Sequence, residues 1–306
     1  MDLGFALPTS GAWATPANVA SVARSADERG FRTLWTFQRV LVPTAFELPS
    51  VYRSVLDPVV VLGFAAAVTS RARLGLAVVN GLFYAPVLLA KQLAAVDVLS
   101  EGRLDAGIGL GWSADEYAAA GVPMAGRGRR YDEWLDCLHH LLTEDPVSFE
   151  GEHYTVPPSH IGPMPVQRPR PPLLIGGSAD AALRRAGSRG DGWISSSRAT
   201  LDDIRAGVGV VRDAAERAGK ARDAVRCVVR GVTVLRNAPV AGADRAPLEG
   251  TTEQIGEDLA RFAELDVDEV FLDLNFDSDQ VGNPDADPAR AMDKATAVLE
   301  SCPPTV

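Results

Sequence analysis

The feature of this sequence that most constrains its fold is a regular alternation of short apolar runs with longer amphipathic segments. Alternating or continuous apolar runs predict strands, and apolar residues spaced three and four apart predict helices. Strands that alternate with helices are typical of a parallel α/β fold. The predicted strands are residues 3–8, 33–37, 73–79, 103–112, 172–177, 193–197, 224–235 and 269–276. The predicted helices are residues 18–31, 59–70, 87–100, 115–121 with 131–143, 180–190, 201–219, 252–266 and 288–301.

Eight such β/α pairs predict a barrel. The chain has 306 residues, and a barrel without insertions needs about 250. We therefore predict one α/β domain over residues 1–306, a TIM (β/α)8 barrel with insertions, and keep a doubly wound sheet as the alternative. The main insertion follows the fourth strand, at residues 144–172, where eight of the 21 prolines gather. This segment is predicted to be irregular and to form a lid over the barrel mouth.

The charge of the chain bears on its partners. A formal net charge of −10 and a pI near 5.0 argue against nucleic acid or an anionic membrane surface, because both attract a basic face. A small-molecule substrate is the expected partner. The N-terminal sequence MDLGFALP has neither a basic start nor a long apolar core, so we expect no signal peptide, no spanning helix and a soluble, cytoplasmic protein.

The cysteines and histidines argue against metal and disulfide chemistry. Cys137, Cys227 and Cys302 are scattered and form no CxxC pair, so neither a disulfide framework nor a thiolate metal site is expected. No HxxxH or HExxH spacing occurs among the histidines, and we therefore predict no metal site.

In a barrel, the active site is built from the loops that follow the strands. Any cofactor and substrate are therefore expected in the cavity that these loops enclose. The residues predicted to converge there are Gln38, Arg39, Val79, Asn80, Leu110 to Ser113, Gly176 to Ser178 and Ser195 to Arg198.

One glycine-rich turn ends the fourth strand. Residues 109–114 fit the loose GxGxx[GA] fingerprint of dinucleotide binding. That fingerprint belongs to the first βα turn of a Rossmann fold, so a Rossmann site is disfavoured here. Gly111, at the rim, is predicted to let a flat ring or a phosphate approach the backbone. Gly107 and Gly109 serve either that purpose or the relief of crowding inside the barrel.

A second turn, Gly176-Gly177-Ser178, ends the fifth strand and precedes a helix. Free backbone N–H groups, the positive end of a helix dipole and a hydroxyl together suit a phosphate. The alternative is a plain tight turn in which Ser178 caps the helix.

Several segments give the chain a family resemblance. These are LGFALP at 3–8, ADERGFRTLW at 26–35, LAKQLAAVDVLSEGRLDAGIGLGWSADEY at 89–117, FEGEHYTV at 149–156 and LLIGGSADAALRRAGSRGDGWISSS at 173–197. Together they resemble the bacterial luciferase-like flavin and deazaflavin oxidoreductases, and the block at 89–117 is the specific part. The resemblance covers about residues 2 to 200. It implies a TIM-barrel oxidoreductase that uses FMN or the deazaflavin coenzyme F420, usually as a homodimer.

The resemblance also implies positions for the cofactor. In the deazaflavin branch a non-proline cis peptide backs the cofactor ring, and the matching bond here joins Ala77 and Val78. Arg127, Arg129 and Arg130 are either contacts for an acidic cofactor tail or a solvated basic loop. The cofactor-binding residues that the resemblance and the loops together suggest are Ala77, Val78, Asn80, Leu110, Gly111, Trp112, Gly176, Gly177, Ser178, Ser195 and Ser196.

One departure from the family concerns catalysis. Many deazaflavin members carry Asp-His at the end of the second strand, and this chain has Gln38 and Arg39 there. Neither is a suitable general acid at neutral pH, because Gln does not titrate and Arg stays protonated. Arg39 is predicted either to stabilise negative charge on a reduced ring or on a substrate, or to pair with Glu47 or another carboxylate.

The sequence is compatible with three classes of function. The first is F420-dependent hydride transfer to or from a small organic substrate, with Arg39 and Gln38 as the catalytic candidates. An FMN-dependent luciferase-like monooxygenase is the alternative within the same class. A barrel that binds the cofactor without catalysis is a second class, and a metal-dependent hydrolase, which the absent histidine pair disfavours, is a third.

Overall fold

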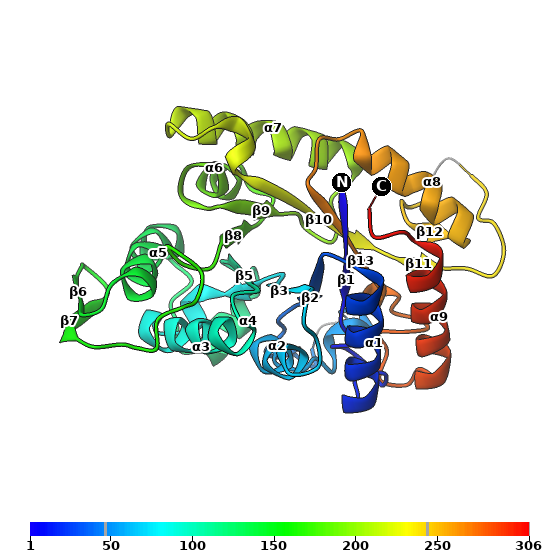
Figure 1. Cartoon of the computed structure of the whole chain (residues 1–306), viewed down its shortest axis with the longest axis horizontal. Helices are drawn as coiled ribbons and strands as arrows, with labels where there is room; N and C mark the ends of the chain where they lie inside the picture. Colours follow the sequence, from blue (N-terminus) through cyan, green and yellow to red (C-terminus); the bar gives the residue numbers. More distant parts are fainter. Residues whose placement is uncertain (46–47, 243–244, 306) are drawn as a thin grey trace.

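Parallel strands close into a barrel in the computed structural model of the chain, whose described residues are 1–45, 48–242 and 245–305 (Figure 1). Each strand pairs with its neighbour in parallel, and the pairing of β3 with β5 closes the ring. The short strand β4, Val79–Asn80, pairs with β5 on the same side. The eight barrel strands in the described residues are β1 Asp2–Ala6, β2 Thr33–Thr36, β3 Arg73–Leu76, β5 Leu104–Gly109, β8 Leu173–Gly176, β9 Gly192–Ile194, β10 Arg226–Val232 and β13 Glu269–Asp273.

Helices flank the barrel on its outside (Figure 1). The TIM barrel is therefore confirmed, and the doubly wound sheet is excluded because its edges would stay open. No helix within the described ranges is long and apolar enough to cross a membrane. The helices are α1 Pro16–Arg29, α2 Pro58–Ala66, α3 Pro86–Leu99, α4 Ala114–Ala119, α5 Arg127–Thr143, α6 Asp180–Arg189, α7 Leu201–Arg217, α8 Thr252–Ala263 and α9 Pro288–Ser301.

Local sequence signals explain where these helices begin. α1, α2, α3 and α9 each begin with proline, whose fixed φ and missing N–H suit the first helical position. Thr15 and Asp57 accept hydrogen bonds from the first turns of α1 and α2. Thr200 and Thr251 form reciprocal capping boxes at α7 and α8. Each cap satisfies backbone donors that the helix itself leaves free.

Apolar side chains fill the inside of the barrel, and small residues make room for them. The indole of Trp35 stacks on Phe271 with ring centroids 5.1 Å apart, and a Cβ at Gly75 would lie 2.2 Å from that indole. A Cβ at Gly107 would lie 1.7 Å from the carbonyl oxygen of Leu76. Gly107 therefore relieves crowding inside the barrel, the second of its two predicted roles.

A buried polar network closes the N-terminal end of the barrel. The Glu269 carboxylate accepts hydrogen bonds from Trp35 Nε1 at 2.8 Å, Thr33 Oγ1 at 3.1 Å and Arg226 Nη2 at 2.8 Å. Arg226 also pairs with Asp105, which is fully buried. Because paired charges fill this end, the space for a ligand is left at the opposite end, where the strands terminate.

Two predicted strands are interrupted. The strand predicted over 73–79 stops at Leu76, and the peptide bond between Ala77 and Val78 is cis, as the resemblance implied. The strand predicted over 224–235 ends at Val232, and β11, Val234–Leu235, pairs instead with β12, Glu249–Gly250.

The prediction that residues 144–172 are irregular was wrong in part. β6, Val147–Glu150, and β7, Thr155–Ser159, form an antiparallel hairpin that lies outside the barrel (Figure 1). The Glu133 carboxylate of α5 accepts hydrogen bonds from the backbone N–H groups of His153 and Tyr154 and so holds the hairpin turn. The prolines of β7 hide this strand in the sequence, but an edge strand tolerates them.

Candidate active site

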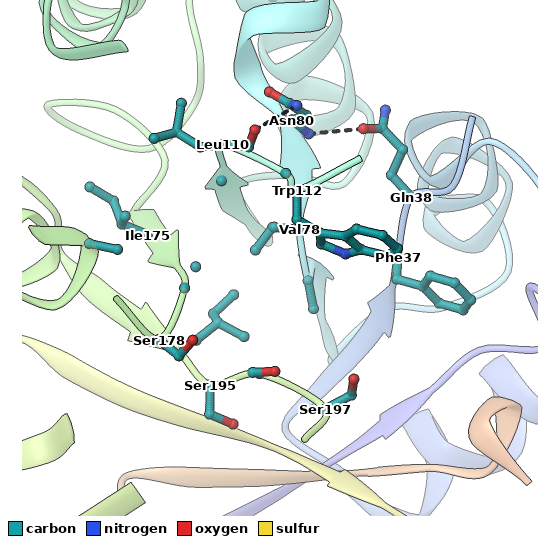
Figure 2. Close-up of a pocket in the computed structure, with 18 of the residues that line it drawn as sticks. Phe37, Gln38, Val78, Asn80, Leu110, Trp112, Ile175, Ser178, Ser195 and Ser197 are labelled. Atoms are coloured by element: carbon teal, nitrogen blue, oxygen red, sulfur yellow. Dashed lines mark hydrogen bonds between the residues drawn. The ribbon is translucent and has the colours of Figure 1, made fainter. Parts of the chain in front are cut away.

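A cavity of about 420 Å³ opens at the C-terminal ends of the barrel strands (Figure 2). Every residue predicted for the catalytic or cofactor site lines it, together with Ser197. Three residues of the wider set of loop positions do not: Val79 is fully buried, Ser113 caps α4, and Arg198 lies outside the lining. The loops therefore converge as the barrel geometry requires.

The floor of the cavity is apolar and centres on Val78. A Cβ added at Gly109 or at Gly176 would lie 2.8 Å from a Val78 methyl carbon. Only residues without a side chain fit beside Val78 at these two positions. Ala77 and Ile175 extend the same lining. The result is an apolar surface with little relief, onto which a flat ring can pack closely.

Asn80 holds the glycine turn that follows β5. Its Nδ2 donates to the Leu110 carbonyl oxygen at 2.8 Å, and its backbone N–H donates to Gln38 Oε1 at 2.9 Å (Figure 2). Gly111 has φ of +62°, and a Cβ there would lie 2.6 Å from Asn80 Nδ2. Gly111 is therefore needed for the shape of the turn, whatever ligand approaches it.

Gln38 is fixed at both ends of its carboxamide. Besides accepting from Asn80, it donates from Nε2 to the hydroxyl of Tyr84 at 2.8 Å. Burial raises the pKa of Tyr84 above its ordinary value, so that hydroxyl stays protonated at neutral pH. Gln38 thus positions the loop after β2 against β4.

The guanidinium of Arg39 is held by an ion pair and by two aromatic rings. Its Nη1 lies 3.0 Å from Glu116 Oε2, and both side chains are less than a tenth exposed. The guanidinium lies between two rings, 4.3 Å from the centroid of Tyr52 and 4.8 Å from that of Trp112. The carboxylate partner of Arg39 is therefore Glu116, and Glu47 lies outside the described residues.

The turn after β8 has the features of an anion site. Gly177 has φ of +139°, a conformation that favours glycine. The predicted alternative, with Ser178 as the cap of the following helix, was wrong: the N-cap of α6 is Ala179, which makes no side-chain capping bond. The first N–H groups of α6 are therefore left without a side-chain cap, and Ser178, Ala179 and Ala182 at this helix start line the cavity.

Serine hydroxyls and an arginine line the same cavity as this turn. Ser195 Oγ accepts a hydrogen bond from Arg230 N at 3.0 Å and Ser196 Oγ accepts one from Arg198 N at 3.2 Å, so the proton of each hydroxyl can be donated to a ligand. Figure 2 shows Ser178, Ser195 and Ser197 on one side of the cavity, opposite Asn80 and Leu110. Arg127 lines the cavity and forms no ion pair with any described residue.

Beside Arg127, Arg185 pairs with Asp132 at 2.7 Å, and this hydrogen bond raises the pKa of the guanidinium. The ring of Tyr131 lies 5.4 Å from the Arg185 guanidinium carbon. The buried hydroxyl of Tyr131 has no hydrogen-bond partner among the described residues, and burial raises its pKa. This end of the cavity therefore offers donors and positive charge.

Sequence reasoning missed part of the lining. Arg230 projects into the cavity from the middle of β10, and Tyr52 reaches it from the long loop after β2. Arg226 and Arg230 stand four apart on one strand, so both point into the barrel, and that spacing was a readable signal. The other missed lining residues are Phe37, Phe83, Glu116, Tyr131, Ile175, Ala179, Ala182, Arg185, Ile194 and Phe276.

None of the four histidines lines the cavity. Within the described part of the chain, no group of three or more His, Cys, Asp or Glu side chains is placed to hold a metal ion. No residue of the segment 144–172 contributes to the lining either.

Comparison with known proteins places the chain among oxidoreductases. A profile of the family described as luciferase-like monooxygenase matches residues 1–248. An uncharacterised protein of Mycobacterium tuberculosis is 33% identical over 312 aligned residues, which cover 98% of this chain and 96% of the relative. An FMNH2-dependent dimethylsulfone monooxygenase of Pseudomonas putida is 35% identical over 133 residues, covering 40% of this chain and 36% of that enzyme.

Two solved structures share the fold. The monooxygenase RslO1 from Streptomyces bottropensis superposes with a TM-score of 0.80 at 23% identity and covers 98% of both chains. An F420-dependent secondary alcohol dehydrogenase, in complex with an F420-acetone adduct, gives a TM-score of 0.77 at 16% identity, covering 100% of this chain and 99% of the other.

Proposed function

Because this chain belongs to the luciferase-like monooxygenase family, we propose that it is an oxidoreductase that binds coenzyme F420 in the cavity at the barrel mouth. FMN is the second candidate. The observation that carries the proposal is that the two ends of the cavity differ in polarity. Its floor around Val78 is apolar, and it ends at the uncapped N-terminus of α6. That polarity matches a cofactor with an apolar ring at one end and a phosphate at the other.

The lining residues fit such a cofactor. Val78, seated between Gly109 and Gly176, would carry the ring. The N–H groups at the start of α6 and the hydroxyls of Ser178 and Ser195 would hold the phosphate.

Bound F420 would supply a hydride to, or take one from, a small organic substrate. The protein's own contribution is to exclude water, to anchor the cofactor and to orient the substrate. Gln38 and Arg39 act as positioning residues in this proposal, since their polar groups already bond to Asn80, Tyr84 and Glu116.

Arg127 favours F420 over FMN. The side chain lines the cavity and has no carboxylate partner among the described residues. It lies one helical turn before Tyr131, whose ring contacts Arg185 of α6, so we assign it to the end of the cavity at which α6 begins. An acidic tail beyond the phosphate would give it one. FMN stays the alternative because the Pseudomonas putida relative is FMNH2-dependent, and reduced FMN would instead activate oxygen in a monooxygenase.

The test is a titration of the purified apo-protein with F420 and, separately, with FMN, followed by quenching of cofactor fluorescence. We expect micromolar binding of F420 and weaker binding of FMN. A preference for FMN would support the monooxygenase, and binding of neither cofactor would contradict the proposal. Binding without turnover of any substrate tried would favour the non-catalytic barrel.

A matched pair of variants locates the site. Ser178→Asp places a carboxylate at the anion end and should weaken binding of either cofactor at least tenfold, by repulsion of the phosphate. Ser188→Asp makes the same change on α6 outside the cavity and should leave affinity unchanged. Equal effects from the two variants would place the phosphate elsewhere.

A further inference from the structure

We propose that one part of this cavity is a substrate compartment for uncharged planar molecules that carry a carbonyl group, with Arg230 as the residue that anchors the carbonyl oxygen. This inference rests on the proposed function, since it names the substrate class of the same site. We call the compartment the aromatic chamber. It is formed by Phe37, Arg39, Tyr52, Trp112, Arg230 and Phe276.

Ring contacts make the aromatic chamber one continuous surface. The ring of Phe276 lies 5.3 Å from that of Phe37 and 5.8 Å from that of Tyr52, centroid to centroid. The Arg39 guanidinium joins Tyr52 to Trp112. Aromatic walls of this kind bind flat ligands through offset or edge-to-face contacts.

The two arginines of the aromatic chamber do not make it an anion site. Arg39 is neutralised by Glu116 at 3.0 Å and Arg230 by Asp273 at 2.8 Å, and both carboxylates are buried. A charged substrate would lose its hydration there without meeting an unpaired counter-charge. Arg127, which has no carboxylate partner among the described residues, is not one of the residues of the aromatic chamber.

Arg230 nevertheless keeps donors for a neutral acceptor. Its Nε bonds to Asp273 Oδ2, and no described residue accepts from Nη1 or Nη2. The guanidinium lies over the rings of Phe37, at 5.0 Å, and Phe276, at 4.6 Å. A carbonyl oxygen placed between these rings would accept from the free Nη groups. Arg stays protonated, so Arg230 binds and polarises the carbonyl and transfers no proton.

The position of Arg230 is fixed by its ion pair with Asp273. Asp273 is fully buried, and its Oδ1 accepts hydrogen bonds from the backbone N–H and the side-chain Nδ2 of Asn275. Arg39 also has unpartnered donors: Nε, which is buried, and Nη2, from which no described residue accepts. We assign the carbonyl anchor to Arg230 because neither of its two Nη groups has an acceptor among the described residues, whereas Arg39 Nη1 is already bonded to Glu116.

Trp112 provides the readout. Its side chain lines the aromatic chamber and is 55% exposed, whereas Trp13, Trp35, Trp134 and Trp193 are at most 2% exposed. The full chain would be titrated with acetophenone, benzoate and ethylbenzene, which share a ring and differ in the polar group. Tryptophan fluorescence is recorded for each, and Trp112→Phe gives the background signal.

Acetophenone should bind at least tenfold more tightly than benzoate or ethylbenzene. In Arg230→Met its affinity should fall tenfold to a hundredfold, to the level of ethylbenzene, as expected for a lost charge-assisted hydrogen bond. Equal or tighter binding of benzoate would show an anion site instead. Equal binding of ethylbenzene and acetophenone, or no binding of either, would overturn the proposal. This comparison uses the unmodified chain, so it does not depend on whether a variant folds.

Repeating the titration with saturating cofactor separates the two proposals. Acetophenone should still bind, and competition between the two ligands would show that no separate compartment exists. If neither cofactor binds while acetophenone does, the proposed function fails and the aromatic chamber remains as a ligand site. If a cofactor binds and acetophenone does not, the aromatic chamber alone is wrong.

Discussion

The role of Arg39 is interpreted differently once its contacts in the structure are known. In the sequence Arg39 stands where the family resemblance implies a histidine, and it is predicted either to stabilise negative charge at the site or to pair with a carboxylate. In the structure its charge is paired with Glu116, which also accepts a hydrogen bond from the backbone N–H of Val40 at 2.7 Å. Glu116 therefore joins the loop after β2 to α4. The Arg39–Glu116 pair shapes the cavity mouth rather than its reactive centre.

Loss of this pair should destabilise the protein. Glu116→Gln leaves a buried guanidinium without a counter-charge, and we expect the free energy of unfolding to fall by about 3 kcal/mol. Asp115→Asn, the neighbouring exposed position on α4, removes the same charge and should change stability by less than about 1 kcal/mol. Urea denaturation followed by circular dichroism measures both. Equal losses would mean that the ion pair contributes nothing.

Two arginines of α5, Arg127 and Arg129, differ in whether they line the cavity. Arg127 lines the cavity, whereas Arg129, two residues on along α5, is exposed and does not. Arg127→Ala should weaken binding of an anionic cofactor about fivefold and reduce the salt dependence of that binding, as the loss of a partly screened charge pair predicts. Arg129→Ala is the control. A larger effect at Arg129 would point to the outer loop as the anion contact.

At the scale of elements, packing decides where helices stop. The helix predicted over 59–70 ends at Ala66. The backbone N–H groups of Ser70, Arg71 and Ala72 donate instead to the Asp27 carboxylate of α1, at 3.1, 2.9 and 2.6 Å. This carboxylate fixes the turn that leads into β3. A contact with a residue more than forty positions away cannot be read from local periodicity.

Asp27 should therefore stabilise the fold in a pH-dependent way. Burial raises the pKa of Asp27, but the backbone hydrogen bonds from Ala72, Ser70 and Arg71 outweigh it, and the net pKa is lowered. A folded-state pKa below the unfolded value of about 3.9 gives stability that is present above that pH and is lost as the pH falls through the folded-state pKa.

Asp27→Asn should cost about 1–3 kcal/mol at neutral pH, because at least one backbone donor loses its acceptor. It should also remove this part of the acid-induced loss of stability. Urea midpoints between neutral pH and pH about 3 measure both effects. An unchanged acid dependence in the variant would assign the effect to other carboxylates.

On the scale of the whole molecule, the barrel separates stability from function. Its N-terminal end is closed by the Glu269–Arg226–Asp105 network, and its C-terminal end holds the cavity. The homodimer implied by the family resemblance, the single domain over 1–306 and the lid at 144–172 stay predictions. The two ends can be tested independently, because no residue of the network lines the cavity.

Glu269→Gln should lower the free energy of unfolding by about 3 kcal/mol, since Arg226 loses one of its two buried counter-charges. Cofactor affinity, measured on the folded variant, should be unchanged. Glu300→Gln, whose pair with Arg29 is exposed, should cost less than about 1 kcal/mol. If the folded Glu269→Gln variant bound the cofactor more weakly, the network at the N-terminal end of the barrel and the cavity at its C-terminal end would be coupled.

The sequence by itself determined the order of the barrel strands and helices, because these follow from the local periodicity of apolar residues. It also determined the turns at the barrel mouth, because glycine, which has no side chain, marks them. The catalytic and cofactor-binding candidates all line the cavity because, in a closed barrel, the loops after the strands converge at one end. Val79, Ser113 and Arg198, which belong to the wider predicted set of loop residues, do not line it. Only the tertiary structure decided which charges are free. Arg39 and Arg230 are neutralised by Glu116 and Asp273, partners that are distant in sequence, whereas Arg127 has no carboxylate partner in the described part of the chain. Pairing between residues far apart in the chain depends on packing, which no local pattern records.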